Sequence, residues 1–123
     1  MKLVPSRRVG AMVLVTAVAG GSVAAGVATA ATSLQINAVN GKLAFTKKSA
    51  SAKAGKVTIR MNNPSSFPHA IAIKGNGVNK KGKVVQKGGT SVVTASLKKG
   101  TYEFYCPVKG HEAGGMKGTL KVS

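Results

Sequence analysis

Three residues able to bind a metal stand at equal intervals in the segment 106–116, which reads CPVKGHEAGGM. They are Cys106, His111 and Met116, and Cys106 is the only cysteine in the 123-residue chain. His69, the other of the two histidines, lies upstream at the start of an apolar run. A thiolate, two imidazoles and a thioether form a mixed soft and borderline ligand set, which favours copper that cycles between Cu(I) and Cu(II). We therefore expect one copper ion as the cofactor, bound by these four side chains.

Short β-strands are the elements that must position these residues. The chain has 16 glycines and no Trp, and alternating apolar and polar residues recur in short runs between turn signals. We expect strands within residues 34–39, 42–48, 57–63, 65–73, 84–97, 101–106 and 118–122, with connections at 49–56 and 74–83. The pattern predicts an all-β fold, a Greek-key antiparallel β-sandwich of seven to eight strands.

Side-chain alternation along two of these strands points His69 and Cys106 into the interior. His69 shares its face with two isoleucines and Cys106 with two aromatic residues, whereas Tyr105 points the opposite way. His111 and Met116 follow in the loop that leaves Cys106, where several glycines allow the chain to curl. The four side chains can therefore converge at one end of the sandwich.

The segment GTYEFYCPVKGHEAGGMKGTLKV, residues 100–122, resembles the C-terminal strand, loop and strand of plastocyanins, and FPHAIAI resembles the segment that supplies their first His. The sequence is thus similar to the cupredoxins, the type 1 copper proteins. The resemblance implies that His69, Cys106 and His111 are the equatorial copper ligands and that Met116 is the axial one. The spacing from Cys106 to His111 is longer than in plastocyanins and closer to rusticyanin-like cupredoxins and phytocyanins.

The same resemblance identifies residues around the ligands. Ala70 stands where many cupredoxins have an Asn or Ser that ties the ligand loops together, so either Asn62 or Asn63 supplies that tie or the loops are less rigid. The backbone N–H groups of Ala70 and Val108 are the expected donors to the sulfur of Cys106, since the proline after it has none.

Two residues are expected to form the electron-transfer surface. His111 lies among small residues, so its ring edge can reach the surface without a bulky neighbour covering it. Tyr105 resembles the plastocyanin Tyr that offers a second, longer route through Cys106.

The first 30 residues have the pattern of an export signal. A basic start is followed by an uncharged run over residues 9–31, and Ala28-Thr29-Ala30 has the small residues that a signal peptidase accepts. We expect a signal peptide at 1–30 and a cupredoxin domain at 31–123. Ser6-Arg7-Arg8 resembles the start of a twin-arginine signal. An uncleaved membrane anchor is the alternative, because the run is about long enough to span a bilayer. Either way we expect a periplasmic, cell-surface or extracellular protein.

The single cysteine is consistent with a sulfur that binds a metal ion. A lone Cys facing a core is usually a small apolar residue, a lone His is often structural, and a Met in a loop often fills a gap. Their order and spacing together favour the metal site over these separate explanations. An exported protein with an odd thiol also either risks oxidation or has the sulfur bound.

The charge of the chain restricts its partners. Its formal net charge is +17, and sixteen of its 19 basic residues follow residue 30, where Glu103 and Glu112 are the only acidic residues. We expect an acidic redox protein or an anionic membrane or cell-wall surface as the partner. The scattered lysines and few aromatics argue against nucleic acid, and we expect a monomer.

Other chemistries fit the residues less well. A cysteine hydrolase needs a base and an orienting Asn or Asp at an accessible thiol. Structural zinc sites rarely use Met. A copper oxidase or nitrite reductase needs histidines for a second copper centre, and none remain. We therefore expect no enzyme but a one-electron carrier, with an extracytoplasmic copper-binding or copper-delivery protein as the alternative.

Overall fold

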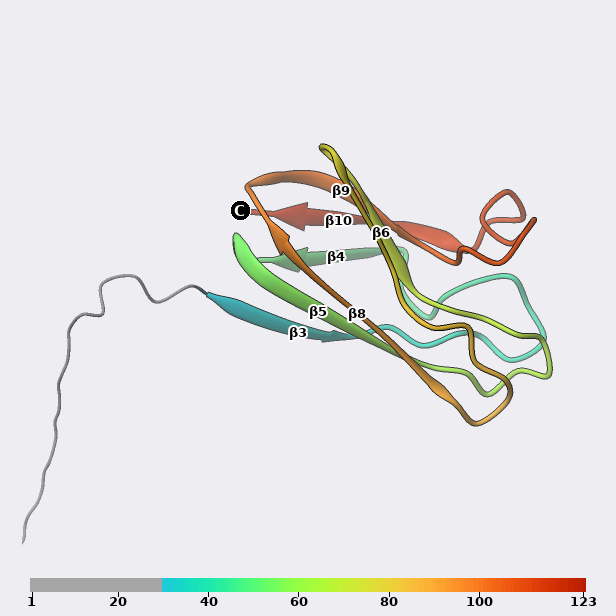
Figure 1. Ribbon diagram of the computed structural model, residues 1–123. Helices are drawn as coiled ribbons and strands as arrows, with labels where there is room; N and C mark the ends of the chain where they lie inside the picture. The colour runs from blue at the N-terminus through green and yellow to red at the C-terminus, as the bar shows by residue number, and fades with distance from the viewer. Residues whose placement is uncertain (1–29) are drawn as a thin grey trace, which may run out of the picture.

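Residues 30–123 are described by the computed structural model, and they form two β-sheets packed face to face (Figure 1). One sheet has five strands in the order β4-β10-β9-β6-β7, and the other has three in the order β3-β5-β8. The strands are β3 (Ala31–Gln35), β4 (Ser49–Ala52), β5 (Gly55–Asn62), β6 (Ala72–Gly75), β7 (Val78–Lys81), β8 (Thr90–Leu97), β9 (Gly100–Tyr105) and β10 (Lys117–Val122). Within this range no helix is long and apolar enough to cross a membrane.

The core fills the space between the two sheets. Strands β5 and β8 alternate exposed and buried residues, so that Val57, Ile59 and Met61 have no exposed surface. Phe104 on β9 is also fully buried, and a side chain at Gly118 on the neighbouring β10 would overlap its ring. Burial of each such large apolar side chain stabilises the fold by about 1.5–3 kcal/mol.

The predicted all-β sandwich is confirmed, with eight strands in two sheets. The pairing is not wholly antiparallel, because β3 pairs with β5 and β4 pairs with β10 in parallel. These two pairs place the strands that precede and follow the 36–48 segment at the edges of different sheets.

Two predicted connections are wrong, because each contains a strand. Residues 49–56 include β4, a short edge strand of small residues that gains its order from β10 rather than from its own hydrophobicity. Residues 74–83 include β7, which pairs with β6 through a turn where Asn76 and Gly77 have φ of 50° and 83°. Val78 is its only apolar residue, so the sequence shows no periodicity there.

Four predicted strands differ from the observed ones. Of residues 34–39 only Leu34 and Gln35 lie in a strand, β3. Residues 42–48 form no strand, and Phe45 makes only an isolated bridge to Ala38. Residues 84–89 contribute only the bridge between Val85 and His69. In 65–73 the strand begins at Ala72, because the preceding residues form a loop that side chains hold. The predicted signal peptide and twin-arginine motif lie outside the described residues, apart from Ala30.

Candidate metal centre

Three metal-binding atoms meet at the end of the sandwich where the loop between β9 and β10 lies (Figure 1). The Nδ1 atoms of His69 and His111 are 3.2 Å apart. The sulfur of Cys106 is 3.5 Å from Nδ1 of His111 and 3.9 Å from Nδ1 of His69. Bonds of about 2.0 Å to imidazole nitrogen and 2.3 Å to sulfur place donors that share one ion ~3–4 Å apart. The three donors therefore already have the separations that a shared metal ion requires.

Backbone hydrogen bonds place these donors. His69 is held by an isolated bridge to Val85, in which its N–H donates to the carbonyl of Val85 and its carbonyl accepts from the N–H of Val85. Cys106 follows β9 directly, and its N–H donates to the carbonyl of Met116 at 3.0 Å. The N–H of Met116 in turn donates to the carbonyl of His111 at 3.0 Å. These two hydrogen bonds connect the two ends of the loop from Cys106 to Met116 and fix His111 between them.

Met116 also lies at the centre. Its side chain is fully buried within the same core cluster as Cys106, and its backbone is bonded to both Cys106 and His111. All four residues expected from the sequence are therefore at one end of the fold, three with facing donor atoms and the fourth buried beside them.

Burial makes the charged forms of Cys106 and His69 unfavourable in the absence of a metal. Desolvation raises the pKa of the Cys106 thiol, against a smaller lowering by hydrogen bonds from the backbone N–H groups of Ala70 and Val108. Desolvation, and next the charge of His111, lowers the pKa of His69. A cation among these donors would stabilise the thiolate and needs neutral imidazoles. The donor set therefore fits a thiolate-binding metal ion such as copper.

The loop that carries His69 is held by Asn63, one of the two asparagines considered from the sequence. Asn63 is buried, and its side-chain amide donates to the carbonyls of Phe67 and Val85 at 2.9 and 3.0 Å. Its side-chain oxygen accepts from the N–H of Ser65 at 2.9 Å. Asn62 is exposed, and its side chain accepts only from Thr90. Asn63 therefore holds the loop that carries His69. Its side chain bonds to Phe67, Val85 and Ser65 and not to the loop from Cys106 to Met116, so it does not replace the tie between the two ligand loops.

A charged cluster around Lys74 is a feature that sequence reasoning missed. Its ammonium nitrogen lies 2.6 Å from a carboxylate oxygen of Glu112, in the ligand loop, and 3.8 Å from one of Glu103 on β9. Both acidic residues of the chain therefore meet at one lysine. Their rarity was the signal that could have indicated a structural role.

The same lysine covers Tyr105. The Lys74 nitrogen lies 4.4 Å from the centre of the Tyr105 ring, and the Tyr105 hydroxyl donates to the side chain of Asn79 at 2.9 Å. Only 5% of Tyr105 is exposed, whereas His111 is partly exposed. Of the two residues expected at the electron-transfer surface, His111 thus lies nearer to solvent. Beside the site, the ring of Phe67 is 46% exposed and packs against His69.

Comparison with known proteins agrees with this geometry. Residues 10–122 match the cupredoxin-like domain family. Auracyanin A, a "blue" copper protein from Chloroflexus aurantiacus, is 26% identical with a TM-score of 0.66, over 76% of this chain and all of that one. A reduced auracyanin from Roseiflexus castenholzii is 25% identical with a TM-score of 0.64, over 74% of this chain and 96% of that one.

More distant structures share the fold. An oxidized amicyanin variant is 17% identical with a TM-score of 0.55, over 73% of this chain and 81% of that one. No curated protein matches the sequence. The chain belongs to the cupredoxin-like domain family, and its cluster of His69, Cys106, His111 and Met116 is typical of a type 1 copper site.

Proposed function

We propose that the protein is an exported one-electron carrier with a single type 1 copper ion and no catalytic activity of its own. The observation that carries this proposal is the set of facing donor atoms of His69, Cys106 and His111, held 3.2–3.9 Å apart by the fold. Bound copper would supply a Cu(I)/Cu(II) couple. The similarity to auracyanin A, a "blue" copper protein, supports the same role.

The protein's own residues limit rearrangement at the site. Asn63 fixes the loop before His69, and backbone hydrogen bonds close the loop from Cys106 to Met116. Burial of Cys106 and His69 excludes water from their donor atoms. A site that changes little between oxidation states favours rapid electron exchange over metal release.

Retention of copper through redox cycles tests this role against copper delivery. The copper-loaded protein should be reduced with ascorbate, exposed to a Cu(I) chelator and reoxidised with ferricyanide over repeated cycles. A carrier should recover its full visible absorbance. Loss of copper to the chelator on each reduction would favour the delivery protein and would contradict electron transfer as the function.

We propose that electrons pass through the partly exposed edge of His111 to a negatively charged partner. The basic charge of the domain would steer such a partner, and the exposed ring of Phe67 adds an apolar contact beside the site. The attraction weakens with salt, because the screening length falls to about 8 Å at physiological ionic strength. Stopped-flow rates with an acidic redox protein should therefore fall as salt rises. A faster reaction with a basic redox protein, or no salt dependence, would contradict the steering.

Export is part of the same proposal. The basic start, the uncharged run at 9–31 and the small residues at 28–30 support it. Intact mass measurement on protein recovered outside the cytoplasm should give a chain that starts at or near Ala31. A full-length mass in a membrane fraction would favour the uncleaved anchor instead.

A further inference from the structure

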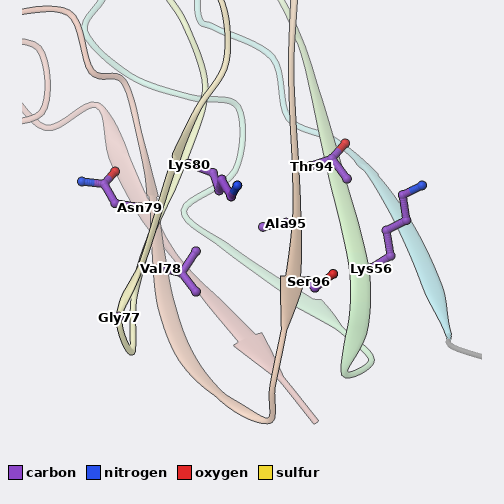
Figure 2. Close-up of a pocket in the computed structure, with 8 residues that line it drawn as sticks. All are labelled: Lys56, Gly77, Val78, Asn79, Lys80, Thr94, Ala95 and Ser96. Atoms are coloured by element: carbon purple, nitrogen blue, oxygen red, sulfur yellow. The ribbon is translucent and has the colours of Figure 1, made fainter.

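A cleft of about 510 Å³ lies between β7 and β8, the edge strands of the two sheets (Figure 2). Val78 extends from β7 toward β8, and Lys80 lines the same side of the cleft. Ala95 and Ser96 on β8 line the other side. Lys56 on β5 is paired in register with Ser96 and lies at the outer rim. We call this feature the β7–β8 cleft.

A smaller hollow of about 310 Å³ adjoins the β7–β8 cleft. The two share Val78 and Ser96 in their linings, and Lys98 and Lys99 line the smaller one. Four lysines, Lys56, Lys80, Lys98 and Lys99, therefore line two neighbouring hollows at this edge of the sandwich.

The positive charge at the β7–β8 cleft has no counter-charge within the fold. Neither hollow is lined by an acidic residue, and the two glutamates of the chain both lie at Lys74. Among residues 30–123, ion pairs are formed by Lys74 and by none of the cleft lysines. A concave surface lined by charges of one sign concentrates the field and attracts ions of the opposite sign.

The donors at the β7–β8 cleft suit phosphate better than carboxylate. Each lysine ammonium offers three donors as a compact point charge, and Ser96 adds a hydroxyl group. No arginine, the residue that matches a carboxylate with two parallel bonds, lines either hollow. The cleft volume lies within the ~300–1,000 Å³ typical of small-molecule sites.

We propose that the β7–β8 cleft binds a soluble, phosphate-bearing polyanion such as a short polyphosphate chain. A bilayer surface is the poorer occupant, because the lysines line hollows at a strand edge and not a flat face. The cleft also lies away from the metal centre. Strand β6 follows the His69 loop and leads to the turn at Gly77, which lines the far part of the cleft. An occupied cleft therefore leaves the exposed edge of His111 free.

Binding of sodium tripolyphosphate to the purified protein tests the proposal. Calorimetry should give saturable one-site binding, and NMR should show the largest shifts at the amides of 77–80 and 94–96. The double variant K56Q/K80Q removes two charges at the cleft and should weaken binding about tenfold, or ~1.4 kcal/mol in total, because contacts to exposed charges are screened by solvent. All four substituted lysines in this variant and its control below are exposed, so folding should be unaffected.

The variant K47Q/K121Q is the matched control, because it removes the same charge at residues outside both hollows. Its affinity should stay within about twofold of the parent. Equal weakening by both double variants would show that net charge alone attracts the anion, and would overturn the cleft. Equal affinity for citrate would overturn the preference for phosphate. Binding to phosphatidylglycerol vesicles with no binding of tripolyphosphate would identify a membrane surface and would also overturn the proposal.

Discussion

The Nδ1 atoms of His69 and His111 lie 3.2 Å apart, although 42 positions separate the two residues in the chain. At this distance at most one of the two facing nitrogens can carry a proton, because two N–H groups cannot share the space. The loop that holds His69 and the loop that closes on Met116 thus bring two metal donors together only in the folded chain. The site therefore exists only in the folded chain, so changes to the site should also change the stability of the fold.

The stability of the copper-free protein should be greatest between about pH 6.5 and 9. Burial lowers the folded-state pKa of His69 below its ordinary 6.5, so the unfolded chain binds more protons and stability falls as pH drops below that value. Burial raises the folded-state pKa of Cys106 above its ordinary 9.0, so stability falls above that pH, where the unfolded thiol ionises. Urea unfolding at a series of pH values measures the loss of stability on both the acid and the alkaline side. If His69→Gln lost stability in acid as the parent does, the acid-side loss could not be assigned to His69.

Asn63→Ala should destabilise the fold and the site together. It leaves the carbonyls of Phe67 and Val85 and the N–H of Ser65 without their side-chain partner, at a cost of ~2–3 kcal/mol. Asn62→Ala is the control, because it removes one exposed bond from Thr90 and should cost about 1 kcal/mol or less. Denaturant unfolding compares the two variants. Equal losses would mean that Asn63 has no special role in holding the His69 loop.

Lys74→Met should loosen the ligand loop. Lys74 is the residue that connects Glu112, in that loop, to strand β6, with a 2.6 Å ion pair. The amides of residues 111–115 should exchange with solvent faster in this variant, because the loop otherwise depends mostly on its own backbone bonds. Lys80→Met removes an equal charge from the same sheet and should leave the exchange unchanged. No difference between the variants would show that the ion pair does not restrain the loop.

Met116→Gln should lower the reduction potential while the visible colour persists. A weak axial ligand adjusts the relative stability of the two oxidation states, and the harder amide oxygen favours the oxidised one. Met116 is fully buried beside Cys106, so the substitution acts at the centre and not at the surface. Spectroelectrochemistry measures the reduction potential and the visible absorbance in one experiment. An unchanged potential would mean that Met116 only packs beneath the loop.

The sequence predicted the metal ligands and the long, regular strands, because the residue types themselves indicate both. The single Cys and the two His indicate the centre by their chemistry, and regular alternation predicts β5, β8 and β9. Strands β4 and β7 could not be predicted, since they are short edge strands whose order comes from pairing with β10 and β6. The ion pairs of Lys74 were also hidden, because register between β6 and β9 decides which residues meet.

The visible spectrum of the copper-loaded protein tests the central claim most directly. A thiolate ligand to Cu(II) gives an intense charge-transfer band, so the protein should be blue or green, should bleach with ascorbate and should lose the band in Cys106→Ser. The buried sulfur, 3.5 Å and 3.9 Å from the two histidine nitrogens, is the basis of this expectation. A colourless Cu(II)-loaded protein whose spectrum is the same in the parent and in Cys106→Ser would contradict it.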